Sequence, residues 1–324
     1  MKKWGLWLLV GVVSLGLVGC QSRGQANQAA KKMTSSRSAS ASSSVIKRKT
    51  PKAKTANAKA KKPVPAAPFK QIAQSTMGHL KGQNAVFIQT TTGQTLSWHN
   101  RSQKAASDIK LFILATVYRQ VAAGKFDLAA TYTLREADKV GGTGNLQAQA
   151  AGTRVTNRDL LKDMMTVSDN TATNIIIREV GGLAAVNQEI KRLGATQTVL
   201  RRKMMDQKAL AAGRDNETSA RDLGNLLMKI WRHQLISRAA DTAILKLMAA
   251  NTNHAKLPKL VPASRQIYNK TGEFDTYGVE NDAAIFAQGK QAVVVVALSQ
   301  NGELSQQVPA MNQLGKQIDA AVFS

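Results

Sequence analysis

The 324-residue sequence contains one cysteine, Cys20, and no acidic residue before Asp108. A single cysteine excludes intrachain disulfides, and at this position it fits an anchor better than a redox or metal role. The four histidines stand at positions 79, 99, 233 and 254, without the spacing of metal ligands. We therefore assign no metal and no cofactor to the chain.

The first twenty residues have the composition of an export signal. Lys2 and Lys3 precede a short apolar stretch that ends in small residues before Cys20. The stretch is short for a transmembrane helix, although a membrane-anchor helix and a plain secreted protein are alternatives. Its end, LVGC, resembles a bacterial lipobox. This resemblance predicts a signal peptide over 1–19, lipid on Cys20, and a location at the outer face of the cytoplasmic membrane.

Residues 20–68 form a second segment with a strong bias of charge. Within 21–68 there are twelve lysines and arginines, no acidic residue and no aromatic residue. This composition cannot bury enough apolar surface to offset the entropy of ordering, so we predict a disordered tether. It would contact anionic lipid headgroups or anionic wall polymers, or serve only solvation.

The net charge of +25 would suggest nucleic acid as a partner, but the chain has no nucleic-acid-binding motif. We predict no nucleic-acid partner, and we expect a monomer.

Residues 69–324 have the pattern of one folded domain. Residues 84–100 predict two strands around Gly93, and residues 265–300 predict three more strands. Helical patterns fill the middle, and residues 107–123 are apolar almost all round, which predicts a buried helix. The order predicts an α+β fold. Strands from both ends would form one antiparallel sheet flanked by helices, with an all-α subdomain inserted.

Ser107 and Lys110, in the stretch AASDIKLF, are three positions apart and would be neighbours on one helix face. A serine hydroxyl is a weak nucleophile without a base. A lysine can be that base when burial and neighbouring cations lower its pKa. The alternative is an N-cap serine followed by a surface lysine, but the apolar run after Lys110 favours a lysine that points inward.

Two further motifs follow Ser107 and Lys110 in the sequence. SDN occurs at Ser168–Asn170 and KTG at Lys270–Gly272. Either could be structural alone, but the ordered set S-x-x-K, SDN, KTG is typical of class A β-lactamases and penicillin-binding proteins. Over nearly all of 69–324 the sequence resembles the class A β-lactamase family, including SDNTATN with Asn174 and the stretch GRDNETSARDLGNLL.

The resemblance implies a catalytic role for four residues. Ser107 would attack an amide carbonyl and become acylated, and Lys110 would take its proton. Ser168 would relay a proton to the leaving nitrogen. Asn170 would bind the substrate amide and position Lys110. The implied substrate is a β-lactam or a peptidoglycan-like D-alanyl amide.

The KTG strand is implied to bind substrate. Lys270 and Thr271, with Gly272 beside them, would hold the substrate carboxylate. The backbone N–H groups of Ser107 and Glu273 would form the oxyanion hole. Glu273 departs from the small residue that commonly follows KTG, and it puts a carboxylate near the expected substrate carboxylate.

The sequence departs from the family most clearly on the omega loop, where the family has R-x-E-x-x-L-N and its glutamate activates water. Aligned through Arg202, the glutamate position falls on Met204 and the asparagine position on Lys208. Methionine cannot accept a proton. Asp206 is either a substitute base in a shifted loop or, as we favour, a loop residue paired with a nearby cation.

Arg202 and Glu217 fall where the family has an Arg–Asp pair at the ends of this loop. Three functions remain open. The chain is a working β-lactamase, a serine enzyme that deacylates slowly or processes D-alanyl groups like a penicillin-binding protein, or a non-catalytic envelope-binding lipoprotein on the same scaffold.

Overall fold

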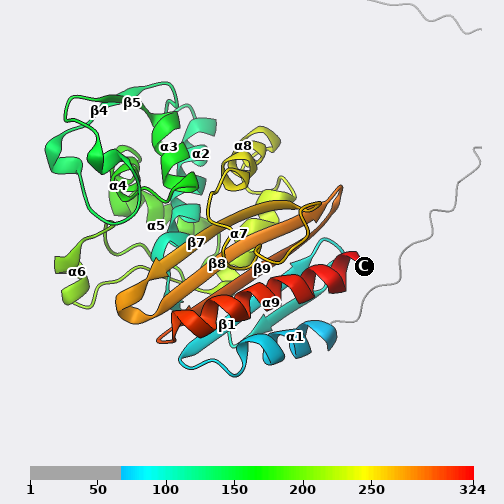
Figure 1. Ribbon diagram of the computed structural model, residues 1–324. Helices are drawn as coiled ribbons and strands as arrows, with labels where there is room; N and C mark the ends of the chain where they lie inside the picture. Colours follow the sequence, from blue (N-terminus) through cyan, green and yellow to red (C-terminus); the bar gives the residue numbers. More distant parts are fainter. Residues whose placement is uncertain (1–66) are drawn as a thin grey trace, which may run out of the picture. The chain divides into compact units, whose positions relative to one another are not determined.

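The computed structural model describes residues 67–324. The predicted signal peptide, Cys20 and nearly all of the predicted tether lie outside the described residues. At the centre is a five-stranded antiparallel sheet of order β2-β1-β9-β8-β7 (Figure 1). Its strands are β1 (Gln83–Thr90), β2 (Thr95–Trp98), β7 (Gln266–Phe274), β8 (Val279–Gln288) and β9 (Gln291–Gln300).

Helices cover both faces of the sheet, and the apolar sequence of β9 is consistent with burial on both sides. Successive side chains of a strand point to opposite faces. Val293 and Val295 pack into one apolar cluster, whereas Val294 and Val296 pack into the other. An unbroken apolar run is therefore stable only in a strand that helices cover on both sides.

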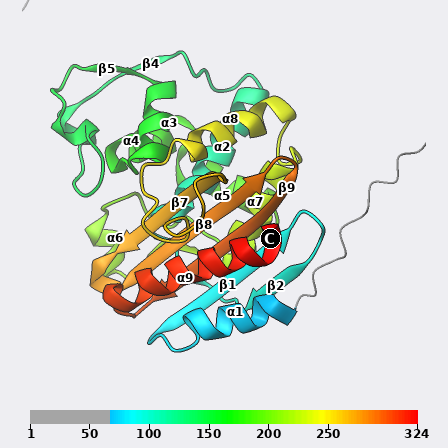
Figure 2. The same ribbon diagram turned by 45° about the vertical axis from the view of Figure 1, so that its right-hand side comes forward.

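Helices from the two ends of the chain cover one face of the sheet, and helices from the middle cover the other. Figures 1 and 2 show α1 and α9 side by side on one face, with the remaining helices beyond the opposite face. Helix α1 begins two residues before the predicted domain start at 69. The helices are α1 (Ala67–Met77), α2 (Lys110–Ala122), α3 (Asn157–Thr166), α4 (Asn170–Glu179), α5 (Gly182–Arg192), α6 (Gln207–Ala211), α7 (Ala220–Trp231), α8 (Arg238–Ala249) and α9 (Leu304–Phe323).

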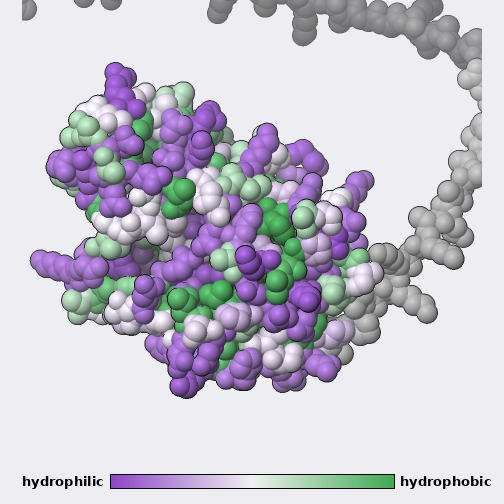
Figure 3. All heavy atoms as spheres, viewed as in Figure 1, coloured by the Kyte–Doolittle hydropathy of each residue, from purple (hydrophilic) through white to green (hydrophobic). Residues whose placement is uncertain are grey.

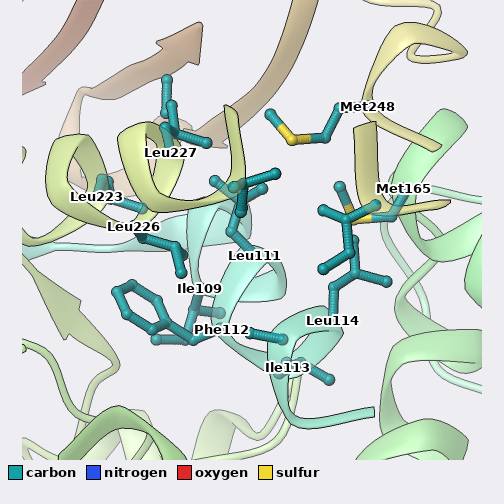
Figure 4. Packing of buried hydrophobic residues seen from close by; sticks show 14 of the residues in the cluster. Ile109, Leu111, Phe112, Ile113, Leu114, Met165, Leu223, Leu226, Leu227 and Met248 are labelled. Carbon is teal, nitrogen blue, oxygen red and sulfur yellow. The ribbon is translucent and has the colours of Figure 1, made fainter. Parts of the chain in front are cut away.

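Helix α2 is the centre of the larger core, as its sequence predicts. Figure 4 shows its side chains pointing in several directions, with Phe112 and Leu111 toward leucines of α7 and Leu114 toward Met165 of α3. The prediction of one helix over 107–123 needs a correction at its start. Ala106–Ile109 form a 3-10 turn, and the α-helix begins only at Lys110.

The α+β arrangement confirms the predicted fold class: strands from both ends of the domain share one sheet, and the middle of the chain is helical. Sequence periodicity did not predict two short strand pairs, since such short elements depend on tertiary contacts. They are β3 (Gln103–Lys104) with β6 (Glu217–Thr218), and β4 (Thr131–Thr133) with β5 (Arg154–Thr156). Within residues 67–324, every helix is too short or too polar to cross a membrane.

Candidate active site

Ser107 lies in the 3-10 turn before α2, where the chain is pressed against strand β7. Ala106 just before it has a positive φ of 44°. A Cβ added at Gly272 would lie 3.0 Å from the backbone nitrogen of Ser107. Only glycine therefore lets the KTG strand pass this close to the serine, which gives Gly272 a direct place in the site.

The ammonium group of Lys110 points into the site and not toward solvent, since the residue is fully buried. Its Nζ donates to the Ser168 carbonyl oxygen at 2.7 Å, to the Ser168 hydroxyl at 3.0 Å and to Oδ1 of Asn170 at 3.0 Å. The sequence interpretation of an inward lysine is correct, and its hydrogen-bond partners come from the SDN motif.

Two causes lower the pKa of Lys110 well below its ordinary value. The larger is burial, which penalises the charged ammonium, and the second is the nearby positive charge of Lys270. A lowered pKa favours the neutral amine, which has the lone pair that a general base needs.

Ser168 links the two lysines of the site. Its hydroxyl lies 3.0 Å from Nζ of Lys110 and 3.1 Å from Nζ of Lys270. The residue has a φ of 56°, a backbone conformation that is uncommon for residues other than glycine. This turn brings both the carbonyl oxygen and the hydroxyl of Ser168 to Lys110.

Asp169, the middle residue of SDN, holds the surrounding backbone. One carboxylate oxygen caps α4 by accepting the N–H of Ala172, and the other accepts the N–H of Leu146, each at 2.8 Å. Gly144 passes beside it with a φ of 104°, and a Cβ there would collide with the carboxylate. The aspartate therefore orders the loop that faces the omega loop across the site.

Lys270 extends from β7 toward the same cluster and is fully buried. Its Nζ also donates to the Thr271 carbonyl oxygen at 2.6 Å. Burial lowers the pKa of Lys270, although the negative charge of Asp108 opposes that effect. Lys270 thus adds a constrained positive charge next to Ser168.

A cavity of about 350 Å³ opens beside Ser107 and Asn170. Figure 3 shows the surface hollowed between the helical part and the end of the sheet near α6. Polar site residues and apolar side chains line it together: Ala106, Ser107, Gly142, Thr143, Asn170, Arg202, Met204, Met205, Gln207, Leu210, Asn216, Glu273, Phe274, Asp275 and Thr276.

Met204 occupies the omega-loop wall of this cavity. Its N–H donates to Oδ1 of Asn174 at 2.8 Å, and its carbonyl oxygen accepts from Nδ2 of Asn174 at 3.0 Å. The asparagine that the sequence singled out therefore positions the backbone at Met204. The thioether that this backbone presents to the cavity can neither take a proton nor orient water.

Asp206 has a structural task at the start of α6. Its Oδ1 accepts the N–H of Ala209 at 2.9 Å, so the carboxylate is the N-cap of that short helix. This differs from the cation pairing that we favoured for it. Lys208, two residues further along, is exposed.

The predicted pairing of Arg202 with Glu217 is wrong. Arg202 forms an ion pair with Asp215 at 2.8 Å, and Glu217 pairs with Arg201 at 2.9 Å. Lys104 also reaches Asp215, at 2.9 Å. The alignment assigned this role to Glu217, two positions after Asp215. Glu217 lies in β6 with its side chain at the surface.

The structure adds site residues that sequence reasoning missed. Asp108, next to Ser107, is fully buried, and neither of its carboxylate oxygens has a hydrogen-bond partner among the described residues. Burial raises its pKa well above the ordinary value.

Thr143 donates to the Ser168 carbonyl oxygen at 2.7 Å. Lys256 is buried behind β7. Only Asp108 carried a signal, as an acid inside the S-x-x-K motif.

Among residues 67–324, no three histidine, cysteine or carboxylate side chains are grouped to hold a metal ion.

Comparison with known proteins agrees with this geometry. The model of the beta-lactamase enzyme family matches residues 68–322, and the chain belongs to that family. Among curated relatives, Beta-lactamase ROB-1 of Haemophilus influenzae is 27% identical over 251 residues, which cover 73% of this chain and 81% of the relative.

Two solved structures extend the comparison. A beta-lactamase from Sphaerobacter thermophilus superposes with a TM-score of 0.75 at 28% identity, covering 80% of this chain and 98% of that one. PBP-A superposes with a TM-score of 0.71 at 25% identity, covering 79% and 95%. A mutant of PBP-A has been solved as an acyl-enzyme complex with penicillin G.

Proposed function

We propose that the protein is a serine hydrolase that forms an acyl-enzyme at Ser107 with a β-lactam or a D-alanyl-type amide and releases the acyl group slowly. The observation that carries the proposal is a contrast between the residues behind Ser107 and the omega-loop wall of the cavity. Lys110 is buried with a lowered pKa beside Ser168, whereas Met204 stands on the omega loop where the family resemblance calls for a glutamate.

In the acylation step, the Ser107 oxygen attacks the amide carbonyl carbon while its proton passes to the neutral amine of Lys110. The C–N bond then breaks, and the Ser168 hydroxyl delivers its proton to the leaving nitrogen while it takes a proton from the Lys110 ammonium. The contacts of Ser168 with Lys110 and Lys270 support this relay. Catalytic hydrogen bonds often form only when substrate is bound, so the bonds of Lys110 to the SDN motif are compatible with a role as base toward Ser107.

Hydrolysis of the acyl-enzyme needs a second group that activates water. Met204 lacks that chemistry, and the Asp206 carboxylate caps α6. We therefore expect the ester at Ser107 to persist for longer than the time needed to form it. This favours behaviour like a penicillin-binding protein over rapid β-lactam turnover.

The test is to incubate the purified protein and Ser107→Ala with a chromogenic β-lactam and a fluorescent penicillin. We expect a stoichiometric covalent label on the wild-type chain, little steady turnover, and no label on Ser107→Ala. Rapid steady turnover would contradict slow deacylation. A label that survives in Ser107→Ala, or no label on either chain, would contradict the acyl-enzyme itself and favour a non-catalytic binding protein.

We also propose that the chain is anchored by lipid on Cys20, outside the described residues. The support is the LVGC sequence and the basic segment after it. Cys20→Ala should move the protein from the membrane fraction to the soluble fraction when cells are fractionated. Unchanged membrane association would refute lipid as the anchor.

A further inference from the structure

Glu273, the residue after KTG, faces the same cavity as Ser107. Its Oε1 lies 2.7 Å from Nζ of Lys256 and accepts from Nδ2 of Asn253 at 3.2 Å. Glu273 is thus held in place by two neighbours.

The carboxylate of Glu273 is ionised under ordinary conditions. Burial opposes ionisation, but the Lys256 ammonium and the surrounding hydrogen bonds outweigh it, and the pKa of Glu273 lies below its usual value. Lys256 is itself 3% exposed and also pairs with Glu280 at 2.6 Å. The positive charge behind the strand is therefore already matched by carboxyl groups of the chain.

This arrangement changes what the KTG strand can bind. An anion at this end of the site would be held by Thr271 and the positive charge of Lys270, but the negative charge of Glu273 already acts on Lys270. A substrate carboxylate would meet a like charge fixed in the wall of the cavity. Repulsion between like charges a few ångströms apart changes binding by roughly tenfold or more.

We propose that Glu273 is a specificity-determining residue that selects acyl substrates whose group opposite Lys270 and Thr271 is uncharged, such as a carboxamide or an ester, over substrates with a free carboxylate there. This inference rests on the proposed acyl-enzyme chemistry at Ser107. The chain supplies its own carboxylate at the position where the family resemblance implies the carboxylate of the substrate.

The test uses one chromogenic cephalosporin as its free acid and as its methyl ester. The acylation rate of Ser107 is measured for both probes by stopped-flow absorbance and intact-protein mass. The variants are Glu273→Gln, which keeps the size and one acceptor oxygen but removes the charge, and Glu273→Ala, in case the first does not fold. The ratio of ester rate to acid rate is compared between chains, so the intrinsic reactivity of each probe cancels.

The matched control is Glu280→Gln, which alters the other partner of Lys256 on the neighbouring strand β8. We expect the ester-to-acid ratio to fall about tenfold in Glu273→Gln, mainly through a faster reaction of the acid, as a Coulomb effect of one charge. The ratio should stay within about twofold of wild type in Glu280→Gln, because Glu280 is not part of the cavity wall.

An unchanged ratio in both Glu273 variants would overturn the specificity role and leave the acyl-enzyme standing. An equal fall in Glu280→Gln would also overturn it, because the effect would then belong to Lys256 and not to a carboxylate in the cavity. No acylation of any chain by either probe would overturn the proposed function, and the inference with it.

Discussion

The acylation side and the omega-loop side of the cavity are built in different ways. On the acylation side, the ammonium groups of Lys110 and Lys270 both lie within hydrogen-bond distance of the Ser168 hydroxyl. On the omega-loop side, the backbone is equally well held, by Asn174, yet the side chain presented is that of Met204. The scaffold of both halves is present, but the groups to which we assign proton transfer lie in one of them.

Two buried carboxyl groups, one on each side, have pKa values that are shifted in opposite directions. Below the acylation side, burial raises the pKa of Asp282 to about 7. In the omega loop, burial opposes ionisation of Asp215, but Lys104 and Arg202 outweigh it and hold the pKa below its ordinary value. Asp282 therefore holds its proton more strongly than a free carboxyl group, whereas Asp215 is an ionised structural tie.

The strongest test of the acylation side is Lys110→Met. Loss of a general base should slow acylation of Ser107 about 10³-fold, because Lys110 is the proposed acceptor of the Ser107 proton. The measurement is the labelling rate with a fluorescent penicillin. Lys208→Met, which removes an exposed lysine near the cavity, should leave the rate unchanged. A labelling rate within threefold of wild type in Lys110→Met would remove Lys110 from the mechanism.

The tie of the omega loop should matter most for stability. Asp215→Asn leaves Arg202 without its buried partner and should lower the free energy of unfolding by about 3 kcal/mol near pH 7. Because the folded pKa of Asp215 is lowered, this stabilisation is present above the unfolded pKa, near 4, and is lost as the pH falls through the folded pKa. Urea unfolding at several pH values measures it.

Glu217→Gln is the control for that measurement, since the pair of Glu217 with Arg201 lies at the surface. Its cost should stay below about 1 kcal/mol. If both variants lowered the free energy of unfolding equally, Glu217 would stabilise the omega loop as the sequence alignment predicted.

Met204→Glu should supply the group that the omega-loop side lacks. A carboxylate on this wall of the cavity can accept a proton from water, and we expect breakdown of the acyl-enzyme to accelerate about 10²-fold. Recovery of free Ser107 after labelling measures this. Met204→Gln, of similar size but without a basic group, should leave the label stable. Equal recovery in both variants would mean that space, not base chemistry, limits deacylation.

The last prediction concerns the pH dependence of stability at Asp282. Its folded pKa of about 7 lies above the ordinary value of 3.8, so the folded state binds more protons than the unfolded state between those limits. Stability should therefore fall as the pH rises through that window, by at most about 1.4 kcal/mol per pH unit. Asp282→Asn should flatten the change in unfolding free energy between pH 5 and pH 7. A parallel pH dependence in the variant would refute the raised pKa.

Strong local patterns made much of the fold predictable. The apolar run after Lys110 predicted a buried helix, and β9 was recognisable from its valines. The 3-10 turn at Ala106–Ile109 was not predictable, because it results from the close passage of β7. The partner of Arg202 was missed for a related reason: which of two nearby acids turns inward depends on the path of the loop.

The sequence by itself determined the order of the elements, the identity of Ser107 and Lys110, and the lack of a basic side chain at Met204. These depend on periodicity and on residue chemistry, which are local. The tertiary structure decided that Lys110 lies between Ser168 and Asn170, that Asp206 caps a helix, and that Glu273 is held by Lys256. The reason is physical: hydrogen bonds and charge pairs between residues far apart in the chain exist only once the chain has folded.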